Sequence, residues 1–341
     1  MTTAWPSLLC PVDFSEPSRS ALCYAAAIAD HFGTRLTVLS VDDPLLGEAA
    51  RSSGHATSLA DDTLQELKRF CRETLVDCET GPKRVAFKVR TGKPAIEILH
   101  EASESHAELI VMSSHGRSGI RKMFFGSTTE RVLRETSVPV FITPDAKPPD
   151  ASLSAIAGHI NRIVTPVDLT PASKHQLIVA AGLAEALSVP LIVTHVLEPI
   201  FVPYSVRVLM PGAEAARRVD AEEQVTRMTE LYASHVHVEP IVVTGDPSEE
   251  IITLVEARHA NLIVMGLHSS GVLGPRMGSV TYRVLCRTDA LVLALPPRPL
   301  EARHQRHLMH PPGASRSLQD PGPADGGRSL RPHRTGRYAA T

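Results

Sequence analysis

The sequence predicts an α/β protein made of two tandem domains, each a parallel sheet with helices on both faces. Short apolar strands alternate with amphipathic helices along most of the chain, which is the pattern of such a sheet. The chain has 341 residues, enough for two domains of roughly 100–200 residues each. The pattern also restarts, because Asp13 after the first strand is repeated as Asp168, 155 residues later. A repeat of that length indicates duplication of a whole domain.

Five strands and the helices between them account for the first half of the chain. The strands are expected, in order, at 7–13, 35–41, 85–89, 109–113 and 138–142. The first helix begins after Ser15, accommodates Pro17 in its first turn and ends at Gly33. The remaining helices are expected at 59–76, from Pro94 onward and from Gly126 onward.

The second half repeats this order of elements. Its strands are expected at 162–168, 191–196, 262–266 and 291–295. Thr170 and Pro171 mark the N-cap and first position of one helix, and another helix is expected at 213–232. Gly278-Ser279 matches Gly126-Ser127 at the start of the last helix of each half.

The repeat boundaries predict four segments. They are a first domain at 1–146, a linker at 147–158, a second domain at 159–296 and a tail at 297–341. The tail is rich in Pro, Arg, His and Gly and has few large apolar residues, so it is expected to be disordered.

Composition narrows the classes of function. A net charge of −2 argues against a dedicated nucleic-acid binder. Five cysteines without a CxxC pair indicate free thiols in a reducing cytoplasm. No apolar run reaches the roughly 18–20 residues of a membrane span, and the N-terminus shows no secretory signal pattern. We therefore expect a cytoplasmic protein with no membrane contact.

The stretch from Leu109 to Leu133 carries the clearest chemistry. It begins as a buried strand, opens into a loop of Ser, His, Gly and Arg, and reaches a helix at Gly126-Ser127-Thr128. The free N–H groups and positive dipole end of a helix start form a ready anion site. Glycines let the main chain approach a ligand that a Cβ would block. This stretch predicts a strand, a phosphate-binding loop and a helix.

The spacing of this stretch resembles the signature of the universal stress protein (UspA-like) family. That signature is Gly, two residues, Gly, nine residues, and Gly followed by Ser or Thr. Here Gly116, Gly126 and Ser127 match the pattern, and Ser113 replaces its first glycine. The resemblance implies a Rossmann-like, adenine nucleotide α-hydrolase-like fold with strand order 3-2-1-4-5 in each domain. It also implies ATP as ligand, with or without Mg2+.

The site residues follow from the resemblance and from the place of ligands beyond the carboxyl ends of strands in doubly wound sheets. Asp13 and Val41 are expected at the adenine and Ser113 at the ribose. The residues expected at the phosphates are Gly116, Gly126, Ser127 and Thr128, with His115 and Arg117 in the same loop. A plainer alternative stays open for each part: Asp13 caps a helix, Gly126-Ser127 forms only a turn, and Arg117 faces solvent.

The second copy keeps only part of this motif. Its counterparts are Asp168, Val196, Gly266, Gly278 and Ser279. Ser269 stands at the second glycine position, eight residues rather than nine precede Gly278, and Pro275 lies inside that gap. We therefore expect nucleotide binding mainly in the first domain.

Two hypotheses of function remain, and a third is weaker. The first is a stress-response regulator that binds ATP and changes its partner contacts, with at most slow hydrolysis or autophosphorylation. The alternative is a pair of non-nucleotide domains acting as a protein-interaction module. The third is an enzyme of the related adenine nucleotide α-hydrolase folds, but the sequence 11–15 after the first strand is not the Ser-Gly-Gly-x-Asp-Ser pyrophosphatase loop that would support it. Other enzyme classes are disfavoured because no GxGxxG, P-loop or GxSxG motif is present. The last strands, 138–142 and 291–295, are expected to join the domains into an intramolecular pseudo-dimer, with a homodimer as a further association.

Overall fold

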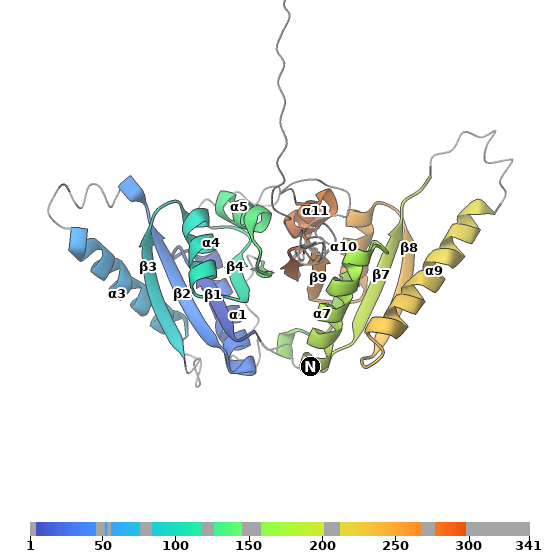
Figure 1. Cartoon of the computed structure of the whole chain (residues 1–341), viewed down its shortest axis with the longest axis horizontal. Coiled ribbons are helices and arrows are strands. Elements are labelled where there is room, and N and C mark those ends of the chain that lie inside the picture. Colours follow the sequence, from blue (N-terminus) through green and yellow to red (C-terminus); the bar gives the residue numbers. More distant parts are fainter. Residues whose placement is uncertain are drawn as a thin grey trace, which may run out of the picture. The chain divides into compact units, whose positions relative to one another are not determined.

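The computed structural model describes residues 5–45, 52, 56–75, 84–116, 126–144, 158–200, 212–267 and 277–297 (Figure 1). The first half contains β1 (Ser7–Pro11), α1 (Glu16–Phe32), β2 (Arg35–Asp42), α3 (Ala56–Thr74), β3 (Val85–Thr91), α4 (Pro94–Glu104), β4 (Leu109–Ser113), α5 (Ser127–Glu135) and β5 (Val140–Thr143). The second half contains β6 (Ile163–Pro166), α7 (Pro171–Leu187), β7 (Leu191–Leu197), α9 (Ala213–Tyr232), β8 (Val238–Thr244), α10 (Pro247–Ala257), β9 (Leu262–Gly266), α11 (Ser279–Arg287) and β10 (Leu291–Leu295).

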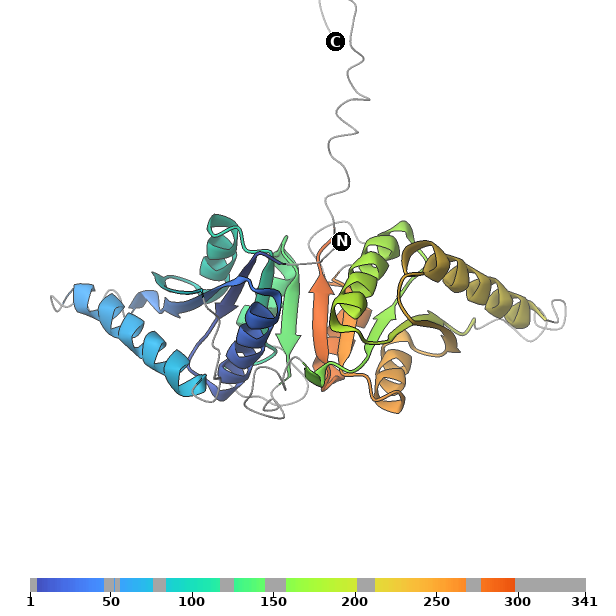
Figure 2. The same ribbon diagram turned by 90° about the horizontal axis from the view of Figure 1, so that it is seen from below.

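The strands form one ten-stranded sheet in the order β3-β2-β1-β4-β5-β10-β9-β6-β7-β8. Each half has the order 3-2-1-4-5, which confirms the predicted fold of two doubly wound domains. Pairing is parallel within each half. The last strands of the two halves, β5 and β10, pair antiparallel, with Leu293 opposite Phe141 (Figure 2).

Two apolar clusters cover the two faces of the sheet. Successive strand residues contribute to opposite faces, as Leu8 and Leu9 of β1 do. One cluster packs under α1, α3, α7 and α9, and the other under α4, α5, α10 and α11. Because both faces are buried, the inner strands are apolar throughout rather than alternating.

Several predicted boundaries need correction. β1 and β6 end at Pro11 and Pro166, two residues before the aspartates expected to close them. β5 begins at Val140 rather than Val138, because the turn around Thr136 uses Val138 for hydrogen bonds to the Thr136 side chain. The predicted linker, apart from Gly158, and the tail beyond Pro297 lie outside the described residues.

The first helices of the two halves end in the same left-handed conformation. Gly33 closes α1 at φ 65°, and Ser188 closes α7 at φ 54°. A Cβ crowds the following carbonyl in this region, whereas glycine does not. Ser188 is exposed and sits where a glycine is preferred.

We expect Ser188→Gly to stabilise the protein by about 0.5–1 kcal/mol, because relief of strain exceeds the extra entropy of an unfolded glycine. Urea unfolding measures this as a higher midpoint at constant slope. Gly33→Ser is the matched control and should destabilise by a similar amount, since a Cβ there meets nothing within 4 Å. A lower midpoint for Ser188→Gly would contradict the argument.

Candidate functional site

The crevice in which doubly wound sheets hold ligands lies where the strand order reverses, which here is beyond the carboxyl ends of β1 and β4. Their ladder joins only Leu8 and Leu9 to Leu109 and Ile110, after which the strands diverge toward their carboxyl ends. The predicted site residues lie on the segments that follow these ends.

Asp13 occupies a rigid turn after β1. Its Oδ1 accepts hydrogen bonds from the Ser15 N–H at 3.1 Å and the Ser15 hydroxyl at 2.5 Å. Ser15, not Asp13, is the N-cap of α1, as predicted. Between them Phe14 is held at φ 63° and packs edge-on against Phe70, with ring centroids 5.5 Å apart. A bulky residue in this region is strained, and such strain persists mainly where surrounding structure enforces it.

Gly116 brings the end of β4 against Asp13. A Cβ at Gly116 would lie 2.6 Å from Asp13 Oδ2, so no other residue fits unless the carboxylate moves. The segments that follow the first and fourth strands, one with an acid and one with a glycine, therefore lie against one another.

Gly126 also lies beside this loop, but the space around it is less tight than around Gly116. Its N–H donates to the Ser114 carbonyl at 3.2 Å, and an added Cβ would be 3.7–3.8 Å from Gly116, His115 and Ser114. These are ordinary contacts, and its φ of −59° suits any residue. The fold itself therefore does not require glycine at 126.

The start of α5 adds a residue to the site. Gly126 is the N-cap, so the N-cap itself has no side chain to offer, and Ser127 is the first helical residue. Ser127 is exposed and Thr128 half-buried. The buried Thr129 instead donates its hydroxyl to the Ser113 carbonyl at 3.0 Å, which ties the helix start to the end of β4. Sequence reasoning missed Thr129, although Thr281 repeats it.

Short hydrogen bonds fold the chain tightly after β4. The Ser113 hydroxyl donates to the His115 carbonyl at 2.5 Å, and the Ser114 hydroxyl lies 3.0 Å from His115 Nδ1. Ser113 continues the strand without a left-handed φ, which explains why a serine is accepted in place of glycine. Arg117 lies outside the described residues.

Val41 and Asp42 are the last two residues of β2. Pro11 pairs with Leu39, so Val41 and Asp13 follow at corresponding positions on adjacent strands. Val41 packs against the apolar cluster under α4 and α5. Burial raises the pKa of the next residue, Asp42, although a hydrogen bond from the Thr63 hydroxyl acts in the opposite direction.

Comparison with known proteins decides the family. The model of the universal stress protein family matches residues 5–144 and 159–296. The chain belongs to the universal stress protein family. A universal stress protein of Mycolicibacterium smegmatis is 26% identical over 298 residues, covering 85% of this chain and 97% of that protein. One from Methanocaldococcus jannaschii is 29% identical over 149 residues, covering 42% of this chain and 84% of that protein.

Solved structures agree on the fold of the tandem form. The crystal structure of a universal stress protein from Archaeoglobus fulgidus aligns with a TM-score of 0.61 at 21% identity, covering 85% of this chain and 98% of that one. Among the described residues, no helix combines the length and apolar character needed to cross a membrane.

The second universal stress domain repeats the scaffold of the site. Leu169 has a φ of 59° like Phe14. Gly278 is the N-cap of α11 and donates to the Leu267 carbonyl at 2.8 Å, and Thr281 donates to the Gly266 carbonyl at 2.8 Å. Ser279 is the first helical residue of α11, as Ser127 is of α5. The gap around Ser269 and Pro275 lies outside the described residues.

Asp168 accepts three hydrogen bonds in the turn after β6. Its Oδ1 accepts from the Thr170 N–H at 3.1 Å, the Thr170 hydroxyl at 2.6 Å and the Ser173 hydroxyl at 2.6 Å. Desolvation works against ionisation, but these hydrogen bonds outweigh it and lower the pKa of Asp168. Val196 packs against the same apolar cluster as Val41.

Proposed function

We propose that the first universal stress domain binds ATP in the crevice between β1 and β4 and acts as a nucleotide-dependent regulator. The contact between Gly116 and Asp13, beside an α5 start whose N-cap is a glycine, carries this proposal. It places main-chain N–H groups, a helix dipole and an acid around one crevice. Two observations fit a phosphate ligand: Gly126 leaves open the space a Cβ would fill, and as the N-cap it offers no side chain of its own to the N–H groups of α5.

The residues have separate tasks in this proposal. Asp13 and the main chain near Val41 hold the purine, and Ser113 lies at the ribose. The phosphates lie on Gly116, Gly126, Ser127 and Thr128, with His115 and Arg117 adding polar contacts from the loop. Mg2+, where present, would neutralise phosphate charge. The expected output is a change in partner contacts rather than chemical turnover.

We also propose that the two halves of the chain form an intramolecular pseudo-dimer. β5 and β10 pair antiparallel over three residue pairs, as the joining strands of an intramolecular pseudo-dimer would. A homodimer of whole chains stays a prediction. The four described cysteines are free, which supports a reducing compartment such as the cytoplasm.

Gly126→Ala is expected to weaken ATP binding by about tenfold or more without changing stability. The added methyl makes only ordinary contacts within the protein, so any loss reports the ligand. Calorimetric titration gives the affinity, and urea unfolding gives the stability. Gly158→Ala is the control, because a Cβ there meets nothing within 4 Å.

Gly116→Ala should differ from Gly126→Ala in its effect on stability. The methyl displaces the Asp13 carboxylate, so affinity and stability both fall. Absence of binding by the wild-type chain at millimolar ATP would reject the nucleotide function. It would favour the alternative, an interaction module in which the same loops only maintain the fold.

A further inference from the structure

One buried glutamine spans the diverging strands of the second domain. Gln176 of α7 donates through Nε2 to the Pro166 carbonyl of β6 and to the Val264 carbonyl of β9, the latter at 3.1 Å. Its Oε1 accepts from the Gly266 N–H at 3.0 Å. Its Nε2 also lies 3.0 Å from the Thr165 hydroxyl. The carboxamide acts as an additional rung between β6 and β9, whose own ladder stops at Val164 and Ile263.

The need for this rung follows from proline chemistry. Pro166 has no N–H, so it cannot continue the ladder toward β9. The Val264 carbonyl and the Gly266 N–H face the gap, and buried main-chain groups require partners. Gln176 is the partner of the Gly266 N–H, and it shares the Val264 carbonyl with the Thr165 hydroxyl, which donates to it at 2.9 Å. Its carboxamide therefore fills the space at the carboxyl ends of the two strands that flank the switch point.

A second side chain closes the same end of β6. The Ser173 hydroxyl donates to Asp168 Oδ1 at 2.6 Å and accepts from the Asp168 N–H at 3.0 Å. In the first domain the corresponding Ser18 hydroxyl donates to the Ser15 carbonyl at 2.9 Å instead. The main chain and carboxylate that would face a purine are thus tied to α7 in the second domain.

The first domain has no counterpart of Gln176. The N-caps Ser15 and Thr170 and the C-caps Gly33 and Ser188 are both 155 residues apart, which aligns Gln176 with Ala21. Ala21 is fully buried and has no polar group. Pro11 matches Pro166 and likewise lacks an N–H, so the ends of β1 and β4 receive no hydrogen bond from this helix position. Cys10 stands where Thr165 supports the glutamine.

We propose that Gln176 closes the crevice of the second domain and restricts nucleotide binding to the first. This inference rests on the proposed ATP function. A ligand entering the second crevice would have to displace a buried carboxamide and take the Gly266 N–H away from its acceptor, which is costly. Ala21 imposes no such requirement. The chain then binds one nucleotide, with the second domain serving as a structural partner.

The test uses the full chain and ATP itself. Calorimetric titration should give one site for the wild type and a second site for Gln176→Ala. The reverse exchange, Cys10→Thr with Ala21→Gln, builds the glutamine rung into the first domain and should weaken its binding by about tenfold or more. Gln224→Ala is the matched control, because Gln224 is a half-buried glutamine of α9 whose side chain donates to Asp220 of the same helix.

Hydrogen exchange supplies a readout that does not depend on ATP. The Gly266 amide should exchange faster in Gln176→Ala and unchanged in Gln224→Ala. Two sites in the wild type would overturn the inference while the ATP function stands. One site in Gln176→Ala despite faster Gly266 exchange would also overturn it. No binding in any variant would reject the ATP function, and the inference with it.

Discussion

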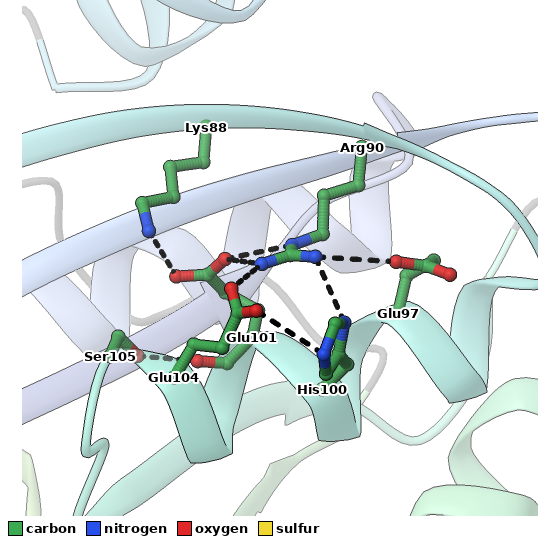
Figure 3. A network of polar contacts seen from close by, with 7 residues as sticks. All are labelled: Lys88, Arg90, Glu97, His100, Glu101, Glu104 and Ser105. Atoms are coloured by element: carbon green, nitrogen blue, oxygen red, sulfur yellow. Dashed lines mark hydrogen bonds and ion pairs between the residues drawn. The ribbon is translucent and has the colours of Figure 1, made fainter.

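Replacing Lys88 by isoleucine and Arg90 by valine is expected to destabilise the protein by about 3–5 kcal/mol, because it leaves a buried charge without partners. Glu101 of α4 is fully buried. Lys88 Nζ lies 2.7 Å from its Oε1, and Arg90 Nε lies 2.8 Å from its Oε2 (Figure 3). Removing both cations leaves the buried carboxylate of Glu101 without a counterion. Urea unfolding monitored by circular dichroism measures the loss.

The second domain supplies the control for this experiment. The residues at the positions of Lys88, Arg90 and Glu101 there are Ile241, Val243 and Leu254. Adding Glu101→Leu to the double variant copies this apolar set, and we expect it to recover most of the lost stability. Apolar replacement of a whole buried ion pair is often neutral or stabilising. A triple variant no more stable than the double would show that the loss came from packing rather than charge.

The same network makes the stability of the protein depend on pH, and it fixes the direction of that dependence. A hydrogen bond from Arg90 lowers the pKa of Glu104 at the rim of the network. A lowered folded-state pKa contributes stability above the ordinary glutamate range, which is lost as the pH falls through the lowered value. The triple variant lacks Arg90, so this part of its acid sensitivity should disappear.

The sequence predicted the fold well because the same alternation of strands and helices occurs in both halves of the chain. It could not predict that Glu101 is buried. Along α4 the residue resembles any charged position of an amphipathic helix, and only the pairing of β3 with the sheet brings Lys88 and Arg90 over it. The strand order came from resemblance to the family, since alternation alone does not determine which strands are neighbours.

The candidate site was predicted in outline and missed in its supports. Asp13, Gly116 and Gly126 carry a recognisable spacing, and the structure brings them together. Thr129 and Gln176 act through buried hydrogen bonds to main-chain groups of other elements. A threonine or glutamine in a helix has no sequence pattern that marks such a bond. The repeat was the available signal, because Thr281 matches Thr129 and Ala21 differs from Gln176.

Phe141→Ala is expected to cost about 3–5 kcal/mol, the usual range for truncating a buried phenylalanine. Phe141 is 2% exposed and lies opposite Leu293 where β5 meets β10. Its ring also lies 6.4 Å from that of Tyr24, centroid to centroid. The lost contacts therefore belong both to the first domain and to its junction with the second.

A double-mutant cycle separates these two contributions. Phe141→Ala and Leu293→Ala should couple by about 0.5–3 kcal/mol, because the side chains are direct cross-strand neighbours. Leu191→Ala is the control: it removes an equally buried leucine from β7, away from the junction, and should add to Phe141→Ala without coupling. Additive losses for Phe141 and Leu293 would contradict an energetic role for the junction.

The single tryptophan allows the coupling between domains to be observed directly. Trp5 packs against Phe32 of α1, with ring centroids 5.8 Å apart, and it lines a pocket with Leu183 and Leu187 of α7, so its fluorescence reports the first domain and its contact with the second. Both repeats lie in one compact unit, Met1–Arg298. If β5 and β10 make that unit cooperative, Leu293→Ala in the second domain must lower the unfolding midpoint seen by Trp5. A midpoint unchanged from wild type would mean that the domains unfold independently, and the antiparallel pair would then align them without stabilising either.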